Sequence, residues 1–402
     1  MLRQTSLLLV FLLLLFTFPA RAQKQLKEVR TALKNEKYSD ALTKVAELRK
    51  DSTWTDSPRL CLYAIEANRG LNDAENVKLY LKQAYDTLSF FSTTKEIITE
   101  CLRLDSIERS NTLVKGKREN RDFINENLRK YYPNIAVASR WLIKKKQYTD
   151  AMVYLRMCLD LPNTPCGEDA ELSNLTSKGK DIKSASLYAT SAYLTKKYSE
   201  VPRYKDLALQ DSSIRSALIE RFALSAEELG DSATYIEWIR LGWEEFPMRP
   251  PFFLRYADHY GKRGDYEKIL ELSKRQIEID STSRAALLAQ SNAYYNLKMY
   301  EEMVESGLAL LSVDSTNVEA NYYVGAGYAA LAGSITMPDN IHSKAYAQAK
   351  ERRLAFCEKA EKYLEKYREF APEQKERWAP ILYKIYFELN RESKFEEIEK
   401  LL

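Results

Sequence analysis

The sequence predicts an all-α protein built as a right-handed superhelical array of antiparallel helix pairs. The first observation is a 34-residue step that separates Tyr260 from Tyr294 and Tyr294 from Tyr328. The same step separates Tyr266 from Tyr300. A fixed period of this length is typical of a helix–turn–helix repeat. No stretch of comparable length alternates apolar and polar residues with period two, so no β-sheet is predicted.

The second observation is a short phrase that recurs along the chain: an aromatic residue, two residues that often include an acid, then apolar residues. Acids in the first turn of a helix are favoured by the positive end of its dipole. The apolar residues begin a stripe with helical spacing. The aromatic residue is therefore predicted to lie at the turn and to fill the gap between two paired helices. The six copies begin at Tyr38, Tyr148, Tyr198, Tyr266, Tyr300 and Phe395.

The third observation is that the predicted second helices end in residues that stop a helix. Proline cannot continue a helix, and Asp and Ser favour turns and the next N-cap. Together, the repeats and the stops predict about nine helical hairpins between Gln23 and Leu402. The stops are Pro162, Pro247, Pro372, Asp280-Ser281 and Asp314-Ser315.

Residues 1–22 have the pattern of a secretory signal peptide. A basic start precedes an apolar run from Leu7 to Phe18, and Ala20-Arg21-Ala22 forms an A-x-A cleavage pattern before Gln23. The alternative is a membrane anchor, which needs about 20 apolar residues to cross a bilayer. This run is shorter, so the mature chain is expected to begin at Gln23 without a stable membrane anchor. The expected location is the periplasm of a Gram-negative bacterium.

The mature chain divides into three predicted segments. Residues 23–131 form divergent hairpins, residues 132–248 form central repeats with an insertion at 163–181, and residues 249–402 form the last repeats with an insertion at 333–357. The first insertion is rich in Gly, Ser, Asn and Lys, which predicts a loop. In the second, a loop precedes a long helix predicted over 343–370. Insertions in repeat arrays often carry binding, but surface loops also vary freely, so both interpretations stay open.

Small residues at fixed positions add to this pattern, because Ala257, Ser291 and Gly325 each precede a phased tyrosine by three positions. With Ala41 and Ala151 in the second helices and the proline stops, the chain resembles the tetratricopeptide-repeat (TPR) family. The resemblance is strong over 249–317, moderate over most of the rest and weak over 90–130. Ile269 and Met303 replace the expected alanine in the best copies, which predicts wider interfaces there.

The resemblance implies a concave groove, lined by the first helices, that binds a peptide or a protein helix. Tyrosine and asparagine there could hydrogen-bond a peptide backbone. The cluster of basic residues with which some family members hold a C-terminal carboxylate is absent from this face. Tyr260, Tyr294 and Tyr328 are interpreted as packing residues. The candidate groove residues are Leu254, Asp258, Leu288, Asn292, Tyr295, Asn296 and Tyr322.

The remaining residues give no sign of a catalytic, metal, cofactor or nucleic-acid site. The net charge falls from +4 to +2 when Arg3 and Arg21 leave with the signal peptide, so nucleic acid is not an expected partner. His259 and His342 lie outside any metal-ligand motif, and no cofactor or metal is expected. Gly325-Ala326-Gly327 is interpreted as a close helix contact rather than a phosphate loop, because no strand precedes it.

Five cysteines follow the predicted cleavage site. Cys158 and Cys166 flank the turn at Pro162 and could form a disulfide in an oxidising compartment. The alternative is that both are buried thiols, since sequence spacing does not fix disulfide geometry.

The predicted function is a non-enzymatic scaffold that binds a peptide or protein partner in the cell envelope. One alternative is an adaptor subunit of an outer-membrane or envelope assembly, including a glycan-uptake complex. A second alternative is an enzyme with its site in an inserted loop, and no catalytic motif supports it.

Overall fold

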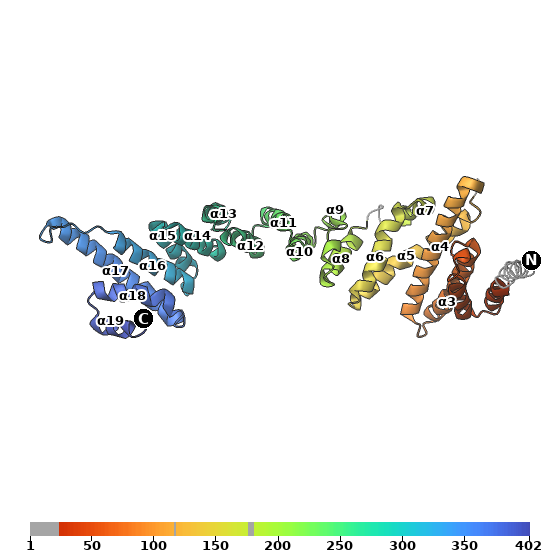
Figure 1. Cartoon of the computed structure of the whole chain (residues 1–402), viewed down its shortest axis with the longest axis horizontal. Helices are drawn as coiled ribbons and strands as arrows, with labels where there is room; N and C mark the ends of the chain where they lie inside the picture. Colours follow the sequence, from red (N-terminus) through yellow and green to blue (C-terminus); the bar gives the residue numbers. More distant parts are fainter. Residues whose placement is uncertain (1–23, 116–117, 176–180) are drawn as a thin grey trace, which may run out of the picture. The chain divides into compact units, whose positions relative to one another are not determined.

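The computed structural model describes residues 24–115, 118–175 and 181–402. Over these residues the chain is all-α, as predicted, and packs as two units: an N-terminal unit up to Leu229 and a C-terminal unit from Gly230 (Figure 1). The predicted signal peptide lies outside the described residues. The boundaries of the three predicted repeat segments stay predictions.

The N-terminal unit contains four helical hairpins and one further helix in the part of the chain described. The first pair is formed by helical residues 24–34 and α2 (Tyr38–Leu48). The other helices are α3 (Pro58–Tyr80), α4 (Thr87–Lys115), α5 (Arg121–Lys144), α6 (Tyr148–Asp160), α8 (Ile182–Leu194), α9 (Lys205–Ala208) and α10 (Arg215–Glu228). Between them lie the short helix α7 (Pro165–Asp169) and the 3-10 turns η1 (Ser52–Trp54), η2 (Leu161–Asn163), η3 (Leu172–Leu175) and η5 (Tyr198–Glu200).

The C-terminal unit begins with one helix, α11 (Ser232–Glu245), and continues as four hairpins. The first helices of successive hairpins lie side by side, because α12 contacts α14, α14 contacts α16 and α16 contacts α18. Each also packs against its own second helix. The hairpins are α12 (Pro250–Gly261) with α13 (Tyr266–Ile279), α14 (Arg284–Leu297) with α15 (Tyr300–Val313), α16 (Val318–Ser334) with α17 (Lys344–Phe370), and α18 (Lys375–Glu388) with α19 (Glu392–Glu399).

The phased tyrosines are packing residues in the C-terminal unit, as interpreted from the sequence. Tyr294 is buried, and Tyr260 and Tyr328 are half-buried against the same core. Helix starts keep the same register: the Ser283 hydroxyl accepts a hydrogen bond from Ala286 N, and Asn317 does the same for Ala320 N. These caps satisfy backbone donors that no helical carbonyl can reach.

Helix α16 approaches both of its neighbours closely, α17 at Gly325 and α15 at Gly327, because glycine leaves room there. A Cβ at Gly325 would lie 2.6 Å from Leu364 Cγ, and one at Gly327 would lie 2.6 Å from Val304 Cγ2. The interpretation of Gly325-Ala326-Gly327 as a packing motif is thus confirmed. The predicted long helix over 343–370 is also present, with Ser343 as its N-cap.

The predicted turn phrase begins an α-helix at Tyr38, Tyr148, Tyr266 and Tyr300. The other two copies behave differently. Tyr198 begins only a 3-10 turn, because Pro202 interrupts the segment that should continue as a helix. Phe395 lies within α19 rather than at its start.

The insertion at 163–181, predicted as a loop, contains short helical segments in its described part. Its described part forms α7 and η3, and Cys166, Ala170 and Leu172 are buried. Asp169 fixes it to the neighbouring hairpins by accepting hydrogen bonds from Arg109 and Arg118. Residues 176–180 of the insertion lie outside the described residues.

Candidate functional site

The predicted groove residues lie on the row of first helices in the C-terminal unit. Leu254 and Asp258 belong to α12, Tyr322 belongs to α16, and the other four belong to α14. We call this surface the first-helix face. Leu254 is 50% exposed and Tyr295 is 40% exposed, so both offer apolar surface to solvent.

Four of the predicted residues come together where α14 meets α16. The ring centroid of Tyr295 lies 6.1 Å from that of Tyr322 and 6.0 Å from that of Tyr323. Asn292 donates a hydrogen bond from Nδ2 to the Tyr323 hydroxyl at 2.8 Å. Asn296 is tied to this group through its own hydrogen bond to the Asn292 carbonyl oxygen. These contacts hold the side chains in one arrangement before any partner binds.

The other predicted residues take no part in this group of contacts. Asp258 forms an ion pair with Lys262 on its own helix. Leu288 is half-buried and packs against the core of the unit. Leu254 is exposed on α12. The first-helix face therefore has one organised cluster rather than a uniform row of contacts.

Arg377 of α18 completes the cluster, and the sequence did not single it out. Its guanidinium carbon lies 3.9 Å from the centroid of the Tyr322 ring. Two parallel hydrogen bonds of 2.8 Å join it to Glu319 of α16. The bonds to Glu319 raise the pKa of Arg377. We call Asn292, Tyr295, Glu319, Tyr322, Tyr323 and Arg377 the tyrosine cluster.

Tyr322 itself is a correction to the predicted groove. Its side chain is 6% exposed and lies beneath Arg377, so in this structure its ring is not open to a partner. Burial raises the pKa of its hydroxyl group. The Tyr322 ring is closed to a partner because the guanidinium of Arg377 stacks on it, and a planar cation covers an aromatic face closely. Tyr295 is then the open aromatic side chain of the cluster.

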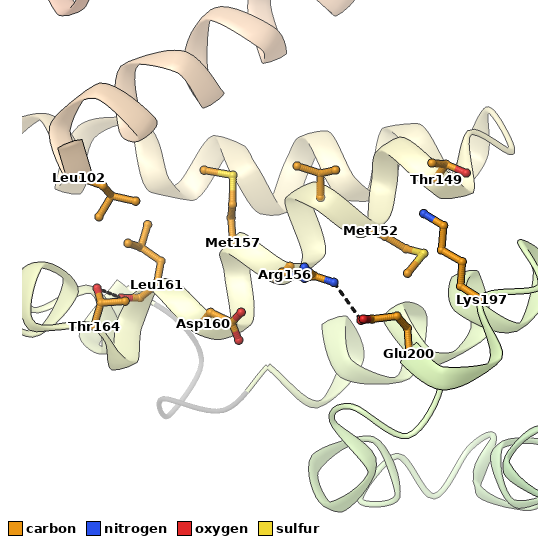
Figure 2. A pocket seen from close by; sticks show the side chains of 11 residues that line it. Leu102, Thr149, Met152, Arg156, Met157, Asp160, Leu161, Thr164, Lys197 and Glu200 are labelled. Carbon is orange, nitrogen blue, oxygen red and sulfur yellow. Dashed lines mark hydrogen bonds and ion pairs between the residues drawn. The ribbon is translucent and has the colours of Figure 1, made fainter. Parts of the chain in front are cut away.

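The N-terminal unit holds a second candidate site, a pocket of about 520 Å³ that the sequence did not reveal (Figure 2). Its lining is largely apolar and comes mostly from α6, with Leu102 of α4 at one end and Lys197 and Glu200 at the other. Met152 and Met157 supply flexible, polarisable side chains that adapt to different ligands. Most of the lining lies on α6, a second helix, rather than on the first helices predicted to form the groove.

Charged groups at the Glu200 end of this pocket are held in place. Arg156 donates a hydrogen bond of 2.9 Å to Glu200 Oε2, and the Tyr188 hydroxyl donates one of 2.5 Å to the same oxygen. The bond from Tyr188 and the charge of Arg156 lower the pKa of Glu200, so it is ionised at neutral pH. Arg203 lies 3.6 Å from Glu200.

The possible disulfide between Cys158 and Cys166 is not formed, and both residues are buried free thiols, as in the alternative interpretation. No disulfide forms because the two thiols lie beside different neighbours. Cys158 lies beside Ser184 at the start of α8, whereas Cys166 lies beside Asp105 of α4. Burial raises the pKa of each thiol to about 12.

Metal-ligand clusters and membrane-spanning helices are both absent from the described part of the chain. No group of three or more His, Cys, Asp or Glu side chains in residues 24–115, 118–175 and 181–402 is arranged to hold a metal ion. Over the same ranges, no helix combines the length and the apolar character needed to cross a bilayer.

Comparison with known proteins finds similar structures but no similar sequence family. No protein-family model and no curated protein matches the chain. The C-terminal part of a TPR repeat-containing protein from Cytophaga hutchinsonii is 14% identical, over 65% of this chain and 92% of that one, with a TM-score of 0.39. The TPR2AB domain of yeast Sti1, solved in complex with pHSP90, is 16% identical over 64% of this chain and 97% of that one, with a TM-score of 0.24.

The P58(IPK) TPR domain is 10% identical over 95% of this chain and 98% of its own, with a TM-score of 0.24. Because these TM-scores are low, the fold is assigned from the helix pairs of this chain and not from the comparisons. In the C-terminal unit these pairs keep the 34-residue step, the side-by-side first helices and the packing tyrosines. The stacked antiparallel helix pairs within each unit make this chain an all-α array of TPR-like helical hairpins.

Proposed function

We propose that this protein is a non-enzymatic scaffold that binds a peptide or protein partner at the tyrosine cluster. Stacked helical hairpins create extended surfaces that such proteins use for binding. The observation that carries the proposal is Tyr295, an exposed ring set among residues that contact one another. Exposed tyrosine is a frequent anchor in protein interfaces because it buries a large area and loses little side-chain entropy.

Preorganisation supports this site over the rest of the first-helix face. The ion pair of Arg377 and Glu319 fixes the ring of Tyr322, and Tyr322 supports Tyr295. A partner that packs on Tyr295 would therefore order few additional side chains, which lowers the entropic cost of binding. Asn296 and the carboxylate of Glu319 are polar groups nearby that could hydrogen-bond the partner backbone.

The proposed place of action is the cell envelope, with the periplasm of a Gram-negative bacterium as the specific location. The signal-peptide pattern of residues 1–22 supports it. Within that setting the chain could act as an adaptor subunit of an outer-membrane assembly, including one for glycan uptake. Cell fractionation tests the location, and co-purification with an outer-membrane protein in mild detergent tests the adaptor role.

The binding proposal is tested by affinity capture from the native envelope with two variants. Tyr295→Ala removes the exposed ring, and Tyr80→Ala removes a tyrosine that is 86% exposed on the N-terminal unit. Both substitutions remove the same chemical group from solvent-facing positions. We expect Tyr295→Ala to weaken capture about tenfold or more, in line with a hot-spot aromatic residue.

Tyr80→Ala should capture the same partner as the wild-type chain, and circular dichroism should show equal helicity for all three proteins. Equal capture by wild type and Tyr295→Ala would remove the tyrosine cluster as the binding site. Loss of capture in both variants would point to a nonspecific effect of removing tyrosine and would also contradict the proposal.

A further inference from the structure

The pocket of the N-terminal unit exists because one hairpin lacks a regular second helix. After α8, the chain forms the 3-10 turn η5, and Pro202 follows in place of a continuing helix. Proline removes a backbone donor and clashes with the preceding turn. The segment then resumes only as the short helix α9. The outward side of α6 is therefore bounded by α4 at one end and by a single turn at the other (Figure 2).

The uncovered side of α6 forms a continuous stripe. The pocket is lined by residues of α6 from Thr149 to Asp160, at steps of three and four positions. This stripe spans about 16 Å at 1.5 Å per residue. Met152, Val153 and Met157 supply its apolar surface, with Val153 48% exposed, and Arg156 lies among them in an ion pair with Glu200. An apolar surface of this kind, with polar groups at both ends, is typical of an interaction site.

Charge at the Glu200 end favours an acidic group on the ligand. Three cations act on Glu200, namely Arg156, Arg203 and Lys197, and all three lower its pKa. Arg156 and Arg203 form ion pairs with Glu200. The second carboxylate of the pocket, Asp160, accepts a hydrogen bond from the Tyr204 hydroxyl. Lys197 forms no ion pair with the residues that the structure describes. Lys197 lines the pocket and carries its ammonium group toward the α6 stripe (Figure 2). A carboxylate on the ligand would add an opposite charge here and would fix the direction of binding.

We propose that this pocket binds an amphipathic helix of a partner protein, about three turns long, with apolar residues spaced three or four positions apart and an Asp or Glu near Lys197. A helix suits the site because it satisfies its own backbone groups, whereas an extended peptide needs a strand edge to pair with. The backbone groups of α6 are already bonded within that helix. This inference rests on the proposed scaffold function and adds a second binding surface to it.

The test uses a phage-displayed library of helix-forming peptides of about 15 residues, randomised along one face, with the full chain as bait. Val153→Glu places a charge in the apolar stripe. Val137→Glu is the matched control, because Val137 is 49% exposed on α5. Lys197→Glu reverses the charge at the pocket end, and Tyr295→Ala is included as a fourth bait.

We expect enriched peptides to carry apolar residues at helical spacing and one acid. They should bind Val153→Glu about tenfold more weakly than wild type, as expected for loss of a central contact. Binding to Val137→Glu and Tyr295→Ala should stay within about twofold of wild type, as is usual for distant surface changes. Replacing the acid of the peptide by lysine should weaken binding to wild type and restore binding to Lys197→Glu.

Peptides without helical spacing, peptides that bind Val153→Glu as tightly as wild type, or the absence of enrichment would each overturn the inference. So would a peptide acid whose replacement by lysine changes nothing. These failures leave the proposed function standing, because that function is tested by capture at Tyr295. Conversely, loss of the Tyr295 site would leave peptide binding at this pocket unchanged.

Discussion

The close contact between α16 and α17 provides a quantitative prediction, because glycine there has a specific role. Replacing Gly325 by Ala adds a methyl group 2.6 Å from Leu364 Cγ and 3.1 Å from Leu364 N. Leu364 is fully buried, and a backbone atom is involved, so the two helices must separate. Alanine favours a helix by about 1 kcal/mol over glycine, and overpacking costs about 1–3 kcal/mol. We expect a net loss of up to about 2 kcal/mol in the free energy of unfolding.

Gly333→Ala is the matched control, because Gly333 lies in the same helix and an added Cβ would have no atom within 4 Å. It should leave stability unchanged or increase it by up to about 1 kcal/mol. Urea unfolding followed by circular dichroism measures both variants, and hydrogen exchange locates the loss to α16 and α17. Equal midpoints for Gly325→Ala and Gly333→Ala would refute the close-packing argument.

Further predictions concern the buried polar contacts. Arg118 and Arg109 hold the pKa of Asp169 below its usual range, so the stability that Asp169 contributes is present above about pH 4 and is lost as the pH falls through its folded-state pKa. Asp169→Asn should lower the free energy of unfolding by about 1–3 kcal/mol at pH 7, and urea titrations should show a smaller difference from wild type below pH 4. A difference that stays constant with pH would contradict this prediction. Gln276 accepts a hydrogen bond of 2.6 Å from Trp243 Nε1 and donates one of 2.9 Å to Pro247 O. Gln276→Ala should therefore lower the free energy of unfolding by about 1–3 kcal/mol, measured by thermal unfolding. An unchanged midpoint temperature would refute this prediction.

Sequence periodicity predicted the C-terminal unit well because each repeat there repeats the same local interactions. Tyr260, Tyr294 and Tyr328 fix the phase of three successive first helices, and that phase correctly places Asn292 and Tyr295 on one face. Periodicity does not predict which side chains of a neighbouring hairpin cover that face. Arg377 follows the long helix α17, where the 34-residue step is broken, so its position over Tyr322 could not be read from spacing.

The N-terminal unit was harder to predict because single residues there override the repeat. Pro202 outweighs the turn phrase at Tyr198, and the resulting gap forms the pocket over α6. The insertion after Pro162 has a loop-like composition, yet Leu172 and Asp169 anchor it. For the insertion, the decisive contacts are tertiary ones between distant parts of the sequence, which local composition does not encode.

The most direct test of the proposed function is site-specific photo-crosslinking in the native envelope, with the photoreactive amino acid p-benzoylphenylalanine replacing Tyr295 in one variant and Tyr80 in another. The aromatic probe preserves ring character at both positions, and both native side chains are exposed. We predict that the probe at position 295 crosslinks to one protein in a single discrete product and that the probe at position 80 does not yield that product. The same product from both positions, or none from position 295, would contradict the proposal that the tyrosine cluster binds the partner.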